Sequence, residues 1–244
     1  PVTLPGAVAQ SVAEALVGLI AVQLKRPGTP YVMAILPGIM DLKHGILSSG
    51  APEYHLFHGI YTELCHELRL PVMATAGITD SKVVDAQAGA EALWSYLCAA
   101  LVGCHLNIGA GSLESHLIGS FEHMVLCDEL IGGVRRFMRG VPIDNSTLGM
   151  DVIQEVGDNL PNAIFIDRDH TTEHYLTEQW QPKVFNRNNF QSWTEKGAQY
   201  THDVCNKKVK DILENYQSEQ LPDDLLVKLE EISAAATSED TLAV

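Results

Sequence analysis

Charged residues are concentrated in Thr79–Gly89 (TDSKVVDAQAG), more densely than in an ordinary turn. Asp80, Lys82 and Asp85 place two carboxylates and one ammonium close together. Thr79 or Asp80 could also accept hydrogen bonds from the first N–H groups of a following helix. The residues are therefore compatible with a capped helix that carries a surface ion pair, and equally with a charged cluster at the mouth of a catalytic site.

A second motif, HTTEH at His170–His174, matches the H-x-x-E-H pattern in which two histidines one helical turn apart bind zinc. Glu178, one further turn along, could supply a third ligand. However, the segment follows a predicted strand and leads into Trp180-Gln181-Pro182, which does not favour a long helix. Ordinary loop histidines and no metal site are the prediction, and a zinc-dependent hydrolase is the alternative.

The glycine-rich stretch Gly109–Ser115 (GAGSLES) could let the backbone approach a phosphate or a large flat ligand. It is neither a G-x-G-x-x-G fingerprint after a first strand nor a P-loop, and no G-x-S-x-G elbow occurs in the chain. Aromatic side chains such as Trp180 are mostly explained by core packing. One that lies near a carboxylate could hold a quaternary ammonium group by cation–π attraction.

Short apolar runs alternate with helical patterns along the chain, which predicts parallel strands joined by helical crossovers. The runs lack polar alternation, as expected for strands that are buried on both faces. The predicted strands are Tyr31–Leu36, Pro71–Ala76, His105–Ile108 and Ala163–Ile166. The predicted helices are Val8–Leu24, Pro52–Leu68, Ser81–Val102, Ser115–Met138, Ser146–Gly157 and 189–235, the last broken near Leu221-Pro222.

A complete (β/α)8 TIM barrel has eight strands in typically about 250 residues. Here four predicted strands use the whole chain, so the prediction is the C-terminal half of a barrel of the TIM type, in the α/β class, with a helical C-terminal extension. The predicted division is 1–188 for the half barrel, 189–235 for the extension and 236–244 for a disordered tail. A doubly wound open sheet is the alternative fold. The N-terminus has no initiator Met and no basic region, which suggests a piece of something longer.

Barrel enzymes of this type build their sites from the C-terminal ends of the strands. Polar and glycine residues gather at all four predicted ends. They are Gly38, Met40 and Asp41; Gly77, Asp80, Lys82 and Asp85; Gly109, Gly111, Ser112 and Glu114; and Asp167, Arg168, Asp169, His170 and Thr171.

Composition restricts the function classes. Lys and Arg number 16 against 31 Asp and Glu, a formal charge of −15 that argues against nucleic-acid binding. No uninterrupted run of eighteen apolar residues occurs, so no membrane span is predicted. The five cysteines include no C-x-x-C pair, which favours free thiols in a reducing compartment and hence the cytoplasm.

Several separated segments resemble, in the same order, the C-terminal half of the trimethylamine methyltransferase-like family of corrinoid methyltransferases. They are GAPE at Gly50–Glu53, Leu70–Ala92, Gly103–Ser115, VLCDELIGGVRR at Val125–Arg136, LGMDVIQEVG at Leu148–Gly157 and Asp169–Arg187. The resemblance also covers the N-terminal residues 1–30, so it runs through almost the whole chain.

The resemblance implies an enzyme of methylated amine metabolism or methanogenesis that moves a methyl group from a methylated amine to the cobalt of a separate corrinoid protein. The corrinoid belongs to that partner, so no cofactor is expected to bind this chain directly. Family members with pyrrolysine carry it in or near the stretch matching Gly77–Val83, where this chain has ordinary residues. Cobalt(I) can displace a neutral amine from a quaternary ammonium without proton transfer. Quaternary amines such as glycine betaine, proline betaine or carnitine are therefore the expected substrates.

The same resemblance suggests roles for the strand-end residues. The expected catalytic residues are Asp80, Lys82 and Asp85. The expected substrate-binding residues are Asp167, Arg168, His170, Thr171 and Trp180, and Gly109 and Gly111 are expected to face the corrinoid. Cation holding is assigned to Asp80, Asp85 or Asp167 beside an aromatic ring, and a substrate carboxylate to Arg168, His170 or Lys82. The chain alone is expected to be inactive and to pair with another copy, because half a barrel leaves sheet edges open. An inactive fragment of the methyltransferase remains an alternative.

Overall fold

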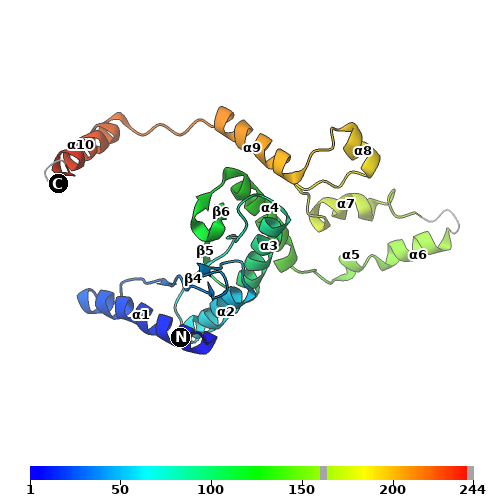
Figure 1. Ribbon diagram of the computed structural model, residues 1–244. Coiled ribbons are helices and arrows are strands. Elements are labelled where there is room, and N and C mark those ends of the chain that lie inside the picture. The colour runs from blue at the N-terminus through cyan, green and yellow to red at the C-terminus, as the bar shows by residue number, and fades with distance from the viewer. Residues whose placement is uncertain (160–163, 241–244) are drawn as a thin grey trace. The chain divides into compact units, whose positions relative to one another are not determined.

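Three short parallel strands form the sheet of the computed structural model, which describes residues 1–159 and 164–240 (Figure 1). The strands are β1 (Met33–Ala34), β4 (Val72–Thr75) and β5 (Leu106–Ile108), hydrogen-bonded in the order β1-β4-β5. Three of the predicted strands and their parallel arrangement are thereby confirmed, and the chain is of mixed α/β class.

The fourth predicted strand is wrong for residues 164–166, and its first residue, Ala163, lies outside the described residues. The carbonyl oxygen of Phe165 accepts hydrogen bonds from the Arg168 N–H and the Thr171 hydroxyl. The segment therefore forms the turn before helix α7 (Asp169–Glu178) instead of joining a sheet.

The two faces of the sheet differ in burial. Pairing of Ala34 with Met73, and of Met73 with Leu106, places these three residues on one face, where Ala34 and Leu106 are exposed. Met33 and Val72 lie on the opposite face and are fully buried. Helices thus cover β1 and β4 on the face of Met33 and Val72, whereas β5 is exposed at all three of its residues. Thr75 at the end of β4 is buried although it shares the face of Met73.

The covering helices follow one another in space as they do in sequence. Helix α1 (Leu4–Lys25) packs on α2 (Pro52–Glu67), α2 on α3 (Ala86–Leu101), and α3 on α4 (Phe121–Met138) (Figure 1). Two buried apolar clusters hold them. The first contains Val8, Met33, Phe57, Tyr61, Cys65 and Val72, and the second includes Ala92, Tyr96, Leu126, Cys127, Leu130 and Cys205.

Helix α1 is long and apolar enough to cross a membrane by length and composition alone, with a mean hydropathy of 1.7 and 11% of its most apolar window buried. The prediction of no span relied on an uninterrupted apolar run, which α1 lacks because of Gln10, Glu14 and Gln23. A soluble protein's core helix or a signal sequence passes the same test. Here Val8 is buried in the first apolar cluster, and Leu4, Val12 and Leu16 pack against it.

Two predicted helices begin later than expected, one because the loop that leaves β4 precedes it and the other because a short antiparallel hairpin does. Helix α3 starts at Ala86, with Asp85 as its N-cap, and α4 starts at Phe121 after the cap Ser120. The hairpin before α4 is β6 (Ser112–Leu113) with β7 (Ile118–Gly119), which encloses the short helix η1 (Glu114–His116). A second hairpin, β2 (Met40–Asp41) with β3 (Ile46–Leu47), lies before α2.

Beyond α4 the chain is helical. The elements are α5 (Asn145–Leu148), α6 (Met150–Asp158), α7, α8 (Phe190–Glu195), α9 (Thr201–Asn215) and α10 (Asp223–Asp240). The predicted break near Leu221-Pro222 is confirmed. The chain divides into compact units Pro1–Val209 and Lys210–Val244, whereas the predicted division placed its first boundary after residue 188. Helix α10 runs past residue 235, and 241–244 lie outside the described residues.

Candidate functional site

The C-terminal end of β4 turns at Gly77, whose backbone is bonded on both sides. Its N–H donates to the Ser95 hydroxyl at 2.8 Å, and its carbonyl accepts from His123 Nε2 at 2.9 Å. Burial lowers the pKa of His123 and so favours the neutral ring, although the bond that its Nε2–H donates to Gly77 O acts in the opposite direction. Gly77 has φ +85°, and a Cβ there would overlap the Tyr96 hydroxyl, so the turn needs glycine.

Just beyond, Glu91 of α3 holds the loop that leaves the strand. Its carboxylate accepts the Thr79 hydroxyl at 2.5 Å and the Asp80 N–H at 2.7 Å. Thr79 is fully buried. The loop is therefore fixed from the helix behind it, and Thr79 does not cap α3 as one interpretation of the sequence expected.

Asp80 joins three loops that are far apart in the sequence. Its carboxylate accepts the Ser48 hydroxyl at 2.5 Å, the Ser49 N–H at 2.8 Å and the Ser115 hydroxyl at 2.6 Å. Burial raises the pKa of Asp80, but the hydrogen bonds from Ser115, Ser48, Ser49 and Gly50 together outweigh burial and hold it below its usual value. We call Ser48, Ser49, Asp80 and Ser115 the Asp80 junction.

The third loop of this junction has an uncommon backbone. Glu114, Ser115 and His116 have φ values of 45°, 51° and 79°, a run of positive-φ residues that contains no glycine. The Glu114 N–H donates to Ser81 O at 2.9 Å, and the Ser115 N–H donates to Thr79 O at 3.0 Å. The left-handed turn is thus held against the loop that follows β4, and strain of this kind is found disproportionately at functional sites.

The other two predicted catalytic residues have different surroundings. Lys82 is exposed, and its Nζ donates to Asp80 O at 2.6 Å. Asp85 caps α3 by accepting the Ala88 N–H at 2.9 Å, and it also accepts the Ser81 hydroxyl at 2.9 Å. The Ala88 bond and the bond from Ser81 keep the pKa of Asp85 low despite the opposing effect of burial.

The predicted corrinoid-facing glycines lie close to the same loop. Gly109 follows β5 directly with φ +120°, and a Cβ there would meet Ile78 Cγ1 at 2.6 Å and Ala76 O at 2.9 Å. Gly111 is buried, and its carbonyl accepts the Ser120 N–H at 2.8 Å. Gly109 therefore allows the loop after β5 to approach the loop after β4, whereas Gly111 lies against Met124 of α4 and the cap residue Ser120.

Asp85 and Trp180, which were predicted to act in one site, both line a cavity of about 650 Å³. Phe185 and Tyr200 add aromatic surface to it. Trp180 packs on α4, where a Cβ on Gly132 would lie 3.1 Å from Trp180 Nε1, and Arg187 Cζ lies 5.8 Å from the ring centroid. One face of this ring thus already has a cation close to it.

The remaining predicted substrate-binding residues lie on α7 and just before it, where they form their own contacts. Arg168 pairs with Glu155 at 2.9 Å and with Asp167 at 3.5 Å. His170 Nε2 lies 3.0 Å from Ser146 O, and the Thr171 hydroxyl donates to Phe165 O. Among residues 1–159 and 164–240, no hydrogen bond or ion pair joins these residues to the Asp80 junction.

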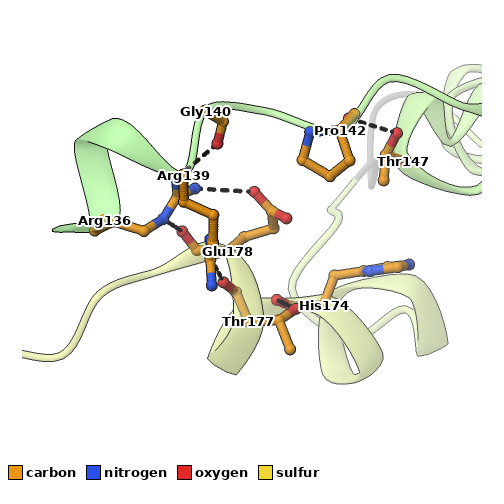
Figure 2. Close-up of polar contacts among 8 residues, drawn as sticks. All are labelled: Arg136, Arg139, Gly140, Pro142, Thr147, His174, Thr177 and Glu178. Atoms are coloured by element: carbon orange, nitrogen blue, oxygen red, sulfur yellow. Dashed lines mark hydrogen bonds and ion pairs between the residues drawn. The ribbon is translucent and has the colours of Figure 1, made fainter. Parts of the chain in front are cut away.

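The HTTEH segment is helical, so that part of the zinc interpretation is met, and the rings of His170 and His174 lie 4.5 Å apart. Glu178 is engaged elsewhere, since its carboxylate pairs with Arg136 at 3.2 Å and its carbonyl accepts Arg136 Nε at 3.0 Å (Figure 2). Arg139 also bonds the carbonyl of Thr177. Within residues 1–159 and 164–240, no group of three or more His, Cys, Asp or Glu side chains is placed to hold a metal ion.

Sequence reasoning proposed Asp80 and Asp85 but missed their partners. Ser48 and Ser49 were not among the predicted site residues, and Ser115 was predicted to begin a helix. The paired hydroxyl residues Ser48 and Ser49, which precede a predicted helix, together with Asp80 at a predicted strand end, are the sequence signal that could have identified the junction. The Asp80 junction holds the loop after β4 by hydrogen bonds. Between residues 77 and 91 this loop and the start of α3 contain three carboxylates and a single lysine, Lys82. This negative charge favours a cationic ligand.

Comparison with known proteins gives a consistent family. The model of the family described as trimethylamine methyltransferase (MTTB) matches residues 1–239. A glycine betaine methyltransferase from Desulfitobacterium hafniense (strain Y51) is 30% identical over 231 residues, covering 94% of this chain and 47% of the relative. A trimethylamine methyltransferase from Methanosarcina thermophila is 30% identical over 226 residues, covering 93% of this chain and 46% of the relative. The chain spans about half the length of the curated relatives it matches.

Proposed function

Because this chain belongs to the trimethylamine methyltransferase family, we propose that it moves a methyl group from a methylated amine to the cobalt of a separate corrinoid protein. The observation that carries the proposal is the family match over residues 1–239, together with a rigid, acidic loop at the end of β4. A hydrolase is not proposed, since Glu178 is bound by Arg136.

The proposed donor is a quaternary amine such as glycine betaine. In that reaction cobalt(I) attacks the methyl carbon, the C–N bond breaks, and its electron pair stays on nitrogen, which leaves as a neutral tertiary amine. No proton has to be supplied, so a site without pyrrolysine suffices. The ordinary residues at Gly77–Val83 support this choice, as does the similarity to a glycine betaine methyltransferase. Catalysis then consists mainly of positioning the two reactants.

The proposed scaffold is part of a (β/α)8 barrel, with the site at the C-terminal strand ends. The parallel order β1-β4-β5 supports it, and so does the exposure of the last strand, β5, along its whole length. Leu106 and Ile108 of β5 are 51% and 41% exposed, as expected if this face belongs to a barrel interior that further strands would complete. We expect the chain to need such completion, by a second copy or by another segment, before it is active in the cytoplasm.

Within this scaffold the predicted catalytic residues take separable roles. Asp80 is proposed as a positioning residue, because its carboxylate is used by the serines of the Asp80 junction. Lys82 is exposed at the rim and could meet a substrate carboxylate or the corrinoid protein. Asp85 with Trp180, and Asp167 with Arg168, His170 and Thr171, stay predicted substrate contacts, and Gly109 and Gly111 stay the predicted corrinoid-facing positions.

The test follows methyl transfer spectrally, as conversion of cobalt(I) to methyl-cobalt on a purified corrinoid protein. The chain is assayed alone, and also mixed with a polypeptide spanning the half of the glycine betaine methyltransferase that lies outside the match. We expect methyl-cobalt from glycine betaine in the mixture. Methyl-cobalt from trimethylamine but from no quaternary amine would overturn the choice of donor, and none from any amine would overturn the activity.

A further inference from the structure

A cavity of about 650 Å³ lies against helices α3 and α4, and none of the four residues of the Asp80 junction lines it. Its size is within the range of small-molecule sites, about 300–1,000 Å³. The two helices supply an aliphatic wall that includes Leu93 and Leu130, and the segment after α7 supplies three aromatic rings, those of Trp180, Phe185 and Tyr200. The aromatic wall exists only while this segment is held against α4.

A single buried carboxylate on α4 holds the segment. Glu129 is 3% exposed, and its Oε1 accepts the N–H groups of Lys183, Val184 and Phe185 at 3.0, 3.0 and 2.9 Å. Its Oε2 accepts the Lys183 N–H at 2.9 Å. Within the part of the chain that the structure describes, no Lys, Arg or His side chain pairs with Glu129. Three successive backbone N–H groups therefore satisfy it, and hydrogen bonds to a carboxylate are about twice as strong as those between neutral groups.

The contact continues along α4 in antiparallel register. Glu129, Gly132 and Arg136 are three and seven residues apart, so they lie on one face of the helix. Trp180 packs on Gly132, where a Cβ would lie 3.1 Å from its Nε1, and Arg136 Nε donates to Glu178 O at 3.0 Å (Figure 2). Positions 129 to 136 of α4 thus meet the segment from 185 back to 178, and the backbone on both sides of Trp180 is fixed to the same helix.

The lining of the cavity specifies the ligand. Beside the three aromatic rings, Asp85 contributes a carboxylate whose pKa is kept low by its bonds from Ala88 and Ser81, so it is ionised at neutral pH. Glu129 also lines the cavity, but its oxygens are engaged by the backbone donors. A quaternary ammonium group has a positive charge, an apolar surface of methyl groups and no N–H to satisfy. It therefore suits an apolar cavity that offers aromatic faces and one carboxylate.

We propose that Glu129 is a positioning residue for substrate binding: it holds Trp180 and Phe185 around the cavity, which receives the quaternary ammonium group. This inference rests on the proposed function for the identity of the cation. As the C–N bond breaks, the positive charge leaves the nitrogen. The aromatic rings therefore stabilise the bound substrate more than the transition state, and loss of Glu129 should raise KM more than it lowers kcat.

The test compares Glu129→Gln with Asp128→Asn, which removes the charge of the adjacent, exposed carboxylate on α4. In Glu129→Gln the amide NH2 would face the N–H donors. Hydrogen exchange at the amides of 183–185 should therefore become faster, while exchange in β4 and α3 stays slow. Binding of tetramethylammonium to the full 244-residue chain, followed by NMR titration, should weaken about tenfold. Asp128→Asn should change neither quantity.

A second variant tests the cavity without touching its support. Phe185→Leu keeps an apolar side chain and the N–H bond to Glu129 but removes one aromatic face. Exchange at 183–185 should stay slow, and tetramethylammonium binding should weaken about threefold. This variant decides the inference even where Glu129→Gln does not fold.

The outcomes separate this inference from the proposed function. No tetramethylammonium-dependent shift in the wild type, unchanged binding in Phe185→Leu, or equal binding by Glu129→Gln and Asp128→Asn would overturn the inference. In the methyl-cobalt assay, an unchanged KM for Glu129→Gln would refute the role of Glu129 and leave the function standing. Glu129-dependent cation binding without methyl-cobalt from any amine would refute the function and leave the cavity as a cation site.

Discussion

The loop after β4 and the segment 167–180 were predicted to contribute to one site, but they are built in opposite ways. Around Asp80, carboxylates are bonded by hydroxyl and N–H groups from distant loops, and the backbone is held in positive-φ turns. In 167–180 the charged groups pair with each other, as Arg168 does with Glu155, on a more exposed surface. The first arrangement fixes geometry and leaves net negative charge, whereas the second neutralises charge and fixes little.

This difference suggests that the residues around Asp80 position a loop, whereas those of segment 167–180 are free to exchange their ion pairs for a ligand. A carboxylate satisfied by neutral donors stays charged without being consumed by a counter-ion, so it can hold a loop and still contribute to the local field. An ion pair between partly exposed side chains can be exchanged for a ligand at small cost. The comparison predicts large stability effects for substitutions near Asp80 and small ones in 167–180.

The largest effect is expected for Gly77→Ala. The residue has φ +85°, and the added Cβ would overlap the Tyr96 hydroxyl, so strain and overpacking add to a loss of about 3 kcal/mol in the free energy of unfolding. Gly157→Ala on α6 is the control, since a Cβ there meets no atom within 4 Å. It should be neutral or stabilise by up to about 1 kcal/mol. Urea unfolding measures the stability of both variants. Equal unfolding midpoints would contradict the conclusion that the turn at Gly77 leaves no room for a side chain.

Asp80→Asn should cause the second-largest loss of stability. The amide NH2 would face donors instead of accepting from them, which costs about 2–3 kcal/mol, or roughly 4–10 °C in Tm. Asp167→Asn makes the same change in the other region and should cost less than about 1 kcal/mol.

The pH dependence of Asp80 has a definite sign. Its folded-state pKa lies below the unfolded value, so its stabilisation is present above about pH 4 and is lost as pH falls through the folded pKa. The wild type should therefore lose stability on acidification more steeply than Asp80→Asn. Parallel acid profiles for the two proteins would show that Asp80 is not bonded as a carboxylate.

The contrast also explains what the sequence could predict. Continuous apolar runs such as Pro71–Ala76 identify strands, because a strand inside a parallel sheet tends to be apolar on both faces. Three of the four predicted strands form. The run ending at Ile166 looks the same locally but has no strand beside it in the described residues, so pairing, which no local pattern encodes, decides the outcome.

At the site, the strand-end rule selected Asp80 and Asp85 as candidates, but their contacts depend on partners from elsewhere in the chain. Ser48 and Ser115 reach Asp80 only through tertiary structure. The left-handed turn that begins at Glu114 contains no glycine, so its positive φ values could not be predicted from residue type. Asp85 rather than Thr79 caps α3, because the helix begins only at Ala86, and the Thr79 hydroxyl donates to Glu91 instead. Residue types identified candidate residues, and the long-range hydrogen bonds that distinguish those residues could not be predicted from local sequence.

Arg168→Ala sharpens the comparison from the other side, with the smallest expected effect on stability. The Arg168 side chain is 26% exposed and its partner Glu155 is 55% exposed, so loss of the ion pair should cost no more than about 1 kcal/mol. If Arg168 reads a substrate carboxylate, the substitution should raise KM for glycine betaine but leave tetramethylammonium binding unchanged, because that cation has no carboxylate. Equal weakening for both ligands would place Arg168 in the scaffold, and no weakening for either would remove 167–180 from the site and leave recognition to the loops around Asp80.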